Sequence, residues 1–301
     1  MVLNRGIISV VIPHLNQPDA LGACLASLAA QSLPRDRFEV IVVDNGSATP
    51  PDEVVAAHPG ARLLHESRPG PGLARNAGVA AARGETLAFI DADCRAHPDW
   101  LRNIAAGLAA AGPGVVLGGD VRIWRAQARR ANAIEAYESV FAYRFKHYIE
   151  KQGYAGTGNL ALHRADFDRV GPFGGIEIAE DMDWGKRAGA AGLRFRYAPD
   201  MVVFHPARAT MRELYAKWDR QIAHYRRMAE QERGWRLRWV LRALLVLASP
   251  VAGFVTVMTS DRIEGLAARG KAVAVMSAVR AHRAATMLSL LRRNGAVVWN
   301  R

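Results

Sequence analysis

The sequence predicts an α/β protein whose mostly parallel sheet is flanked by helices. Short β-branched runs bounded by turn residues predict strands, and helical patterns separate them. The strand runs are apolar throughout rather than alternating, which is typical of parallel strands covered on both faces. The predicted strands are Ile7–Pro13, Phe38–Asp44, Ala61–His65 and Glu85–Asp91, and the predicted helices between them are Asp19–Gln31, Asp52–His58 and Gly72–Arg83.

The second half continues the pattern with fewer strands. We expect helices at Pro98–Ala111 and Ala131–Glu150, a strand at Val115–Trp124, closing strands at Arg194–Ala198 and Met201–Phe204, and a long basic helix from Met211. An aromatic stripe near i, i+4 spacing favours core packing over a binding face. Its members are Tyr137, Phe141, Phe145 and Tyr148.

Composition excludes several classes of protein. Half of the 301 residues are hydrophobic, which allows a sizeable core. Only two cysteines occur, Cys24 and Cys94, without a CxxC pair, so neither a disulfide scaffold nor a zinc ribbon is expected and a reducing cytosol is the default. The first residues lack an apolar signal core, because Pro13, His14 and Asn16 interrupt it.

Positive charge is concentrated in the last third of the chain. The formal net charge is +12, yet residues 1–209 hold 23 basic and 22 acidic side chains, whereas residues 210–301 hold 17 basic and 6 acidic ones. The last third is therefore the candidate for contact with an anionic partner.

Polar residues follow three of the predicted strands, at the edge where ligands bind in such sheets. Pro13 and Asn16 follow the first strand, Asp44 opens the DNGS turn after the second, and Asp91 opens the DAD stretch after the fourth. Asp44 suits hydrogen bonds to a nucleotide base or ribose, although DNGS is also good turn chemistry by itself. We expect these groups to meet at one edge.

The DAD stretch, Asp91-Ala92-Asp93, predicts a metal site. Two carboxylates so close together repel each other and are tolerated where a cation lies between them and a ligand. Carboxylate oxygens suit Mg²⁺ or Mn²⁺, which often bridge protein carboxylates to substrate phosphates. The alternative is a solvated turn or helix cap.

Three further features carry candidate chemistry with structural alternatives. RPGPGLARNAG at 68–78 fails both the dinucleotide and the P-loop templates, but the helix that it opens favours anions near Arg75 and Asn76. Glu180 and Asp181 begin a helix, where they either complement its dipole or supply a general base. His205, after a predicted strand, is either a packed histidine or a third metal ligand.

Taken together, these motifs resemble family 2 glycosyltransferases, which have the GT-A fold. The resemblance covers about residues 7–227 and rests on VVIPHLN, EVIVVDNGS, GLARNAG…ARGETLAFIDADC, GTGNLALHR and EDMDW in the family's order. It implies a nucleotide-sugar donor, usually with uracil as its base, and Mn²⁺ or Mg²⁺ as cofactor.

The resemblance also implies residue roles. Asp181 would be the catalytic base. The nucleotide-sugar site would contain Pro13, His14, Asn16, Asp44, Arg75, Asn76, Asp91, Ala92 and Asp93. Asp93, Asp91 and His205 would serve the metal, Asn159, Glu180 and Trp184 would lie on the acceptor side, and Arg226 or Arg227 would hold the leaving diphosphate.

One candidate base and no evident nucleophile predict a single displacement that inverts the anomeric centre. The chain departs from the family at His14-Leu15, where a small polar residue and an aromatic are common. It also lacks the QxxRW motif of processive members, so we expect transfer of one sugar to a glycan or lipid-linked saccharide.

The basic tail suggests a membrane partner. Ala243–Ser260 has no charge over 18 residues, barely long enough for a span, and basic residues flank it on both sides. A helix lying in the interface, or a re-entrant pair, fits better, at the inner face of the cytoplasmic membrane; a span and a soluble appendage are the alternatives. We expect a glycosyltransferase domain at 1–230, with halves at 1–124 and 125–230, and a helical region at 231–301.

Two other functions compete with this interpretation. A sugar-nucleotide nucleotidyltransferase shares the α/β platform, but its Gly-rich, basic first loop is absent after Val11. A nucleic-acid-binding module would use the basic tail, yet those charges flank an apolar run and no aromatic stacking platform accompanies them. We therefore expect no nucleic-acid partner.

Overall fold

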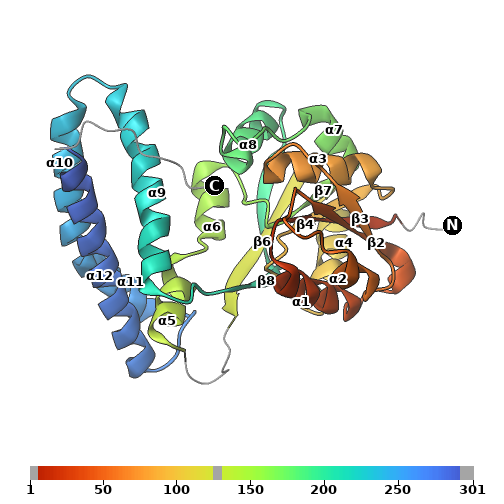
Figure 1. The fold of residues 1–301 in the computed structure, drawn as a ribbon, viewed down its shortest axis with the longest axis horizontal. Helices are drawn as coiled ribbons and strands as arrows, with labels where there is room; N and C mark the ends of the chain where they lie inside the picture. Colours follow the sequence, from red (N-terminus) through yellow and green to blue (C-terminus); the bar gives the residue numbers. More distant parts are fainter. Residues whose placement is uncertain (1–5, 125–130, 292–301) are drawn as a thin grey trace. The chain divides into compact units, whose positions relative to one another are not determined.

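The computed structural model describes residues 6–124 and 131–291, drawn in colour in Figure 1. The chain forms two compact units. The sheet unit comprises Met1–Arg122 and Arg144–His205, and the helical unit comprises Ile123–Tyr143 and Pro206–Arg301. Both units therefore draw on two separate parts of the chain.

The sheet unit is built on one mixed sheet of order β3-β2-β1-β4-β7-β6-β8-β5. The pairs β1/β2, β1/β4 and β2/β3 are parallel, and β4/β7, β6/β7 and β5/β8 are antiparallel. The strands are β1 (Ile8–His14), β2 (Phe38–Asp44), β3 (Ala61–His65), β4 (Thr86–Ile90), β5 (Arg95–Ala96), β6 (Val115–Trp124), β7 (Asn159–His163) and β8 (Arg194–Pro206).

Helices cover both faces of this sheet (Figure 1). Val11 of β1 and Phe89 of β4 are register partners and so share a face; Gly78 of α3 lies against Val11, and Phe167 of α7 against Phe89. Gly107 of α4 lies against Leu117, on the opposite face. The helical segments are α1 (Pro18–Ala29), η1 (Arg35–Arg37), α2 (Asp52–Ala56), α3 (Pro71–Ala81), α4 (Trp100–Ala111), α6 (Phe145–His147), η2 (Tyr148–Gln152), α7 (Arg164–Val170) and α8 (Glu180–Ala190).

The central strands are dry, which confirms the interpretation of their continuous apolar runs. Every residue of β2 is buried, and Val10, Val11 and Ile12 of β1 are inaccessible to solvent. The predicted α/β class with helices on both faces is confirmed. Because β7 runs antiparallel to β4, its first residue, Asn159, pairs with the last residue of β4, Ile90. The Gly-rich loop before β7 therefore reaches the edge where β4 ends.

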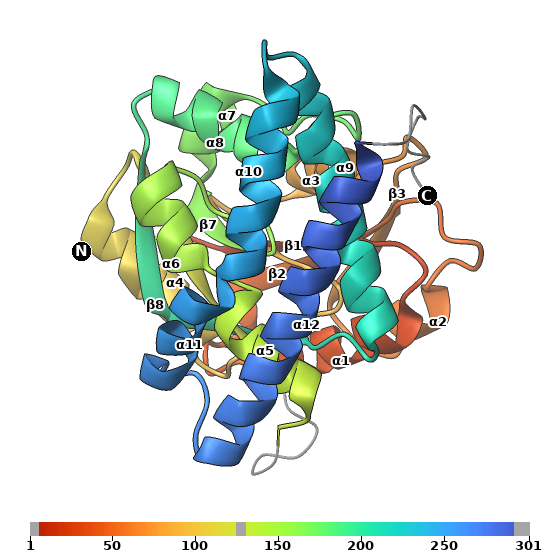
Figure 2. The same ribbon diagram turned by 90° about the vertical axis from the view of Figure 1, so that its left-hand side faces the viewer.

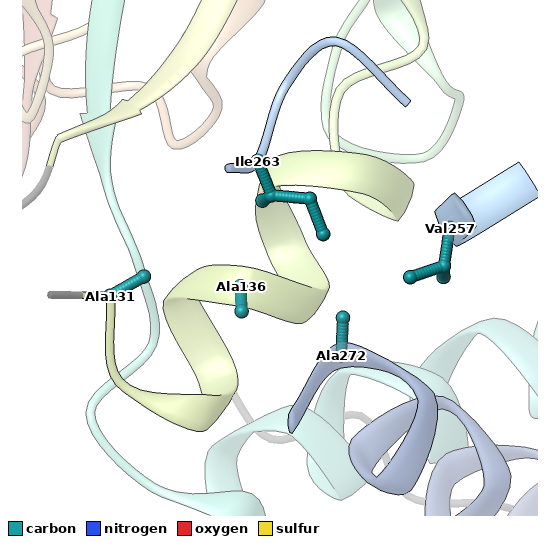
Figure 3. Close-up of a cluster of buried hydrophobic side chains, with 5 residues drawn as sticks. All are labelled: Ala131, Ala136, Val257, Ile263 and Ala272. Atoms are coloured by element: carbon teal, nitrogen blue, oxygen red, sulfur yellow. The ribbon is translucent and has the colours of Figure 1, made fainter. Parts of the chain in front are cut away.

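The helical unit consists of α5 (Ala133–Phe141), α9 (Met211–Glu230), α10 (Trp235–Ala248), α11 (Pro250–Thr259) and α12 (Leu266–Leu290). Figure 2 shows α10 and α12 side by side. Small side chains allow α5, α11 and α12 to approach closely; the cluster in Figure 3 contains Ala131, Ala136, Val257, Ile263 and Ala272. A second cluster joins Trp239 and Ala243 of α10 to Ile222 of α9 and Met287 of α12.

Two predicted elements differ in the structure. The helix expected over Ala131–Glu150 ends at Phe141, because its aromatic stripe serves two cores: Tyr137 packs in the helical unit, whereas Phe145 packs in the sheet unit. The two closing strands expected before His205 form one strand, β8, that continues through Pro206.

Candidate active site

A buried histidine–carboxylate pair joins the carboxyl ends of β1 and β2. His14 Nδ1 lies 3.0 Å from Asp44 Oδ1, and both side chains are almost inaccessible to solvent. His14 Nε2 accepts a hydrogen bond from the Gln17 amide, so Nδ1 carries the proton and donates it to Asp44. Burial raises the pKa of Asp44, but hydrogen bonds from Ser47 and His14 outweigh it and hold the pKa below its ordinary value. Asp44 is therefore a charged acceptor at neutral pH.

Hydrogen bonds connect the loops that follow β1, β2 and β3. Asn16 adopts a left-handed backbone (φ 54°); its amide donates to Ser47 Oγ at 2.8 Å, and its Oδ1 accepts from Ala48 N. Asn45 Nδ2 donates to the backbone of Glu66 and Arg68, and its Oδ1 accepts from Gly70 N at 2.7 Å. Asn45 and Ser47 were not predicted as site residues, although the DNGS turn contains both.

A single arginine links three segments far apart in the sequence. Arg75 of α3 is 3% exposed and donates to Asp91 Oδ1 at 2.6 Å and to Glu180 Oε1 at 3.1 Å. It thereby brings the DAD stretch and the first turn of α8 to the same edge of the sheet. This arrangement brings Arg75 and Asp91 together, and it gives both Arg75 and Glu180 partners that the sequence analysis missed.

The Gly-rich loop fits so closely against Asp91 that a side chain at position 158 would require Asp91 to move. A Cβ added to Gly158 would lie 2.3 Å from Asp91 Oδ2. We expect Gly158→Ala to displace Asp91 and to lower transfer by about 10²-fold, the typical cost of a misplacement near 1 Å in a reacting site. Steady-state transfer by the purified variant checks this.

Gly189→Ala is the matched control. Gly189 lies in α8 with nothing within 4 Å of an added Cβ, so full activity is expected. Wild-type activity in Gly158→Ala would show that Asp91 does not depend on this contact.

The end of β4 and the end of β8 bring two metal-ligand types together. His205 Nε2 lies 3.1 Å from Asp93 Oδ2, and Cys94 Sγ completes a group whose candidate ligand atoms all lie within 4.8 Å of one another. Burial raises the pKa of Asp93, but the hydrogen bond and charge of His205 outweigh it and leave the pKa below its ordinary value. Burial, followed by the charges of Asp91 and Asp93, raises the pKa of the Cys94 thiol well above its ordinary value.

Asp181 has the environment of a proton acceptor. It lies in the first turn of α8, and its Oδ1 accepts a hydrogen bond from Met182 N at 2.7 Å. Burial, together with the charge of Glu180, raises the pKa of Asp181 above its ordinary value, against the opposing effects of the Met182 amide and Arg75. Asp183, two residues on, bonds Arg187 instead, at 2.9 Å.

Three predicted contact residues have structural roles in the structure. Asn159 is fully buried and accepts from Trp100 Nε1 while its Nδ2 donates to two strand carbonyls. Asn76 uses both amide atoms on the backbone of Phe173. Trp184 is 1% exposed, with its Nε1 bonded to Gly171 O. These hydrogen bonds are all internal to the protein, and the expected places of Asn76 beside the donor and of Asn159 and Trp184 on the acceptor side stay predictions.

The remaining predicted residues are placed as follows. Pro13 is half-buried in β1, and Ala92 is buried between the two carboxylates. Arg226 and Arg227 lie on α9 in the helical unit, where Arg226 Nε bonds Glu230 at 2.7 Å. Their assignment to a leaving diphosphate stays a prediction.

The family model for glycosyl transferase family 2 matches residues 9–171, which extend from the second residue of β1 past β7 and include the DAD stretch. The chain belongs to glycosyl transferase family 2. Membership makes it an enzyme of glycosyl transfer.

Curated relatives agree with this assignment. Glycosyltransferase AglE of Haloferax volcanii is 33% identical over 207 residues, which are 67% of this chain and 67% of AglE. Pre-mycofactocin glycosyltransferase of Mycobacterium tuberculosis is 28% identical over 70% of this chain, and the match spans 45% of that relative's length.

Solved structures agree on the fold. Mannosyltransferase PcManGT of Pyrobaculum calidifontis, solved with GDP-Man and Mn²⁺, superposes with a TM-score of 0.59 at 22% identity, over 97% of this chain and 88% of that one. A fragment of S. aureus TarS solved with UDP-GlcNAc gives 0.55 at 18% identity, over 91% and 90% of the two chains. The observed sheet and helices therefore form a GT-A fold.

Proposed function

We propose that this enzyme is an inverting, divalent-metal-dependent glycosyltransferase. It moves one sugar from a nucleoside-diphosphate sugar, a UDP-sugar in our proposal, to a glycan or a lipid-linked saccharide. The observation that carries the proposal is the Asp93–His205 pair at 3.1 Å, on the edge that also holds Asp44 and Asp91. The Mn²⁺ and nucleotide-sugar in the PcManGT structure support the same chemistry.

The donor's base and ribose would lie over the ends of β1 and β2. The Asp44 carboxylate is charged and fixed by His14 and Ser47, so it presents a pre-oriented acceptor to an N–H of the base. Pro13 and Asn16 would border this position, and Asp91, held by Arg75, would face the ribose or a water on the metal. Hydrogen bonds already fix these loops before the donor binds, so donor binding would cost little conformational entropy in them.

The Asp93–His205 pair fits Mn²⁺ or Mg²⁺. A carboxylate oxygen and an imidazole nitrogen are ligands that Mn²⁺ accepts, and Asp93 keeps its charge at neutral pH. Cys94, in contrast, is buried beside the pair, and a soft sulfur ligand suits Mn²⁺ or Mg²⁺ less well than a carboxylate does, so Cys94 would pack against the site. When bound, the ion would supply stabilisation for the negative charge that grows on the leaving diphosphate.

Asp181 would accept the acceptor's hydroxyl proton. Its raised pKa makes it a stronger base than an ordinary aspartate, and Glu180, held by Arg75, fixes the turn that carries it. Glu180 would border the acceptor. Trp184 would help to shape the acceptor side by fixing α8 through its buried ring and its hydrogen bond to Gly171 O. One base and one displacement would give inversion of the anomeric centre.

We further propose that the acceptor and the membrane are linked. A lipid-linked saccharide would be met at the inner face of the cytoplasmic membrane, and the basic last third of the chain suits an anionic surface. Residues 1–230 would carry the transfer chemistry, with Arg226 or Arg227 near the leaving diphosphate, and residues 231–301 the membrane contact.

The pH dependence of transfer should reflect Asp181. A base must be unprotonated to act, so kcat/KM should fall as the pH drops through the pKa of Asp181. Because that pKa is raised, the acid limb should lie above the ordinary value of 3.8. The measurement is kcat/KM against pH at two saturating Mn²⁺ concentrations. An acid limb whose midpoint pH shifts with the Mn²⁺ concentration would instead indicate that protons compete with Mn²⁺ for its ligands, and it would not report Asp181.

A donor panel tests the proposed function. Thermal unfolding of the full chain is followed with UDP-, GDP- and other nucleotide-sugars, each with and without Mn²⁺. We expect stabilisation by one donor class that requires the metal, followed by release of its diphosphate with an acceptor. Pyrophosphate release from a nucleoside triphosphate, without transfer from any sugar donor, would favour a nucleotidyltransferase and contradict the proposal.

A further inference from the structure

Helix α10 is apolar on its exposed side as well as on its buried side, unlike a soluble surface helix. Its buried side carries Trp239 and Ala243, which pack against α9 and α12. With about 3.6 residues per turn, Leu237, Leu241 and Leu244 point to the opposite side, away from that packing. A soluble helix is polar there. These three leucine side chains are between 50% and 69% exposed, so they would gain free energy from a partner that buries them.

The helix that follows repeats this arrangement. Gly253 and Val257 of α11 are buried, and an added Cβ on Gly253 would lie 2.2 Å from Met276 Sδ of α12. Val251 and Val255 lie on the other side and are 81% and 60% exposed. We call the exposed apolar residues of the two helices the leucine–valine face; they are Leu237, Leu241, Leu244, Leu245, Leu247, Val251, Phe254 and Val255. A contiguous face of this kind marks an interaction site.

Arginines border the leucine–valine face instead of interrupting it. Arg236 and Arg242 of α10 fall on opposite flanks by helical spacing. Arg242 stacks on Tyr225 at 4.8 Å and Arg236 on Trp235 at 5.7 Å. Within residues 6–124 and 131–291, neither guanidinium makes a salt bridge.

A further excess of positive charge lies on α12. Burial and then the charge of Arg280 lower the pKa of Arg283, with a smaller contribution from Arg242. Arg242 of α10 therefore lies near the arginines of α12, and α12 contains no acidic side chain that would offset their charge.

We propose that α10 and α11 lie in the plane of an anionic phospholipid bilayer, with the leucine–valine face in the acyl layer and Arg236 and Arg242 at the lipid phosphates. This inference deepens the membrane contact in the proposed function, and it stands whichever sugar the enzyme transfers. An apolar face flanked by arginines is the pattern of helices that bind at a membrane interface. Charge complementarity selects anionic lipid over a second copy of this chain, because two such faces would bring like charges together.

The same features favour lying in the bilayer surface over crossing it. Among the described residues no single helix is long and apolar enough to cross a membrane, and only α10 and α11 together, bent by 44°, reach that length and composition. One side of both helices is already committed to protein, through Trp239 and Gly253. The remaining side is a single apolar face, which a bilayer surface covers completely.

Vesicle flotation of the full chain tests the partner. We expect the protein to float with phosphatidylcholine vesicles that contain phosphatidylglycerol, and to do so less in high salt. Leu241→Glu/Leu244→Glu should lower the vesicle partition coefficient by about 10²-fold. Each of the two leucines contributes about tenfold to binding when the acyl layer buries it. Arg236→Gln/Arg242→Gln should weaken binding to anionic vesicles only. Arg194→Gln/Arg196→Gln removes two exposed charges of the sheet unit and should bind like the wild type.

Spin labels measure the depth. Nitroxides on cysteines introduced at Leu237, Leu244 and Val255 should all report a similar shallow depth in oxygen-accessibility measurements, about 5–10 Å below the phosphates. The native Cys24 and Cys94 are buried, so the wild-type chain treated in parallel gives the background. The Mn²⁺-dependent thermal shift with donor shows that each variant is folded. A variant that keeps this shift but no longer binds vesicles has lost only the membrane contact, and not the donor site.

Several results would overturn this proposal. They are absence of flotation, equal flotation of Leu241→Glu/Leu244→Glu and wild type, and depths that increase steadily from Leu237 to Val255, which would indicate a span. A solution dimer that Leu241→Glu/Leu244→Glu dissociates, without vesicle binding, would assign the leucine–valine face to a second copy.

Discussion

Replacing Asp181 by asparagine is expected to lower transfer by about 10²–10⁴-fold while donor binding is kept. Asparagine preserves the shape of the side chain and can still accept from Met182 N, but it cannot take up the acceptor's proton. The effect should appear in kcat and in kcat/KM alike, because the lost interaction belongs to the transition state. Donor binding is measured separately, by the metal-dependent thermal shift.

Asp183→Asn is the matched control for this variant. Asp183 lies in the same first turn of α8, but its carboxylate bonds Arg187 rather than facing an acceptor. We expect it to keep transfer near the wild-type rate. Equal losses in the two variants would point to damage of the helix, and normal turnover by Asp181→Asn would remove Asp181 from its assigned role.

Replacing Asp93 by alanine is expected to abolish the Mn²⁺-dependent part of the donor's thermal shift. Transfer should fall by about 10³-fold, since a bound metal contributes several kcal/mol to charge stabilisation in such reactions. His205→Gln should weaken the metal dependence less, because Asp93 remains as the charged ligand. Thermal unfolding across a Mn²⁺ titration measures both variants.

Asp99→Ala serves as the control for Asp93→Ala. Asp99 lies a few residues downstream and is engaged by Ser32 Oγ at 2.7 Å and by Arg102 at 3.2 Å. Its loss should leave the metal dependence unchanged. An Asp93→Ala variant that still shows the full Mn²⁺-dependent shift would contradict the assignment of this carboxylate to the metal.

The sequence was sufficient to predict the parts of the site that local patterns specify. Continuous apolar runs predicted the parallel strands, and polar residues directly after them, such as Asp44 and Asp91, had to meet at one edge of the sheet. His205 was a candidate third metal ligand beside Asp91 and Asp93, but the sequence did not indicate that the pairing of β5 with β8 would bring it to Asp93.

Tertiary contacts determined the rest. Nothing local indicates that Arg75 reaches Glu180, 105 residues away, or that the Asn159 amide accepts from Trp100 and donates to two strand carbonyls. A polar residue in a family motif is equally compatible with ligand contact and with internal hydrogen bonding, and the sequence does not separate the two. The helix expected over 131–150 was wrong for a similar reason, because its aromatic stripe divides between two cores.

The most direct test of the central claim is pulsed electron paramagnetic resonance of Mn²⁺ bound to the enzyme with a nucleoside diphosphate. If Asp93 and His205 hold the ion against the diphosphate, the spectrum will show ³¹P coupling together with ¹⁴N coupling from an imidazole, and His205→Gln will lose only the nitrogen signal. Phosphorus coupling without any nitrogen coupling, or nitrogen coupling that survives in His205→Gln, would contradict the account.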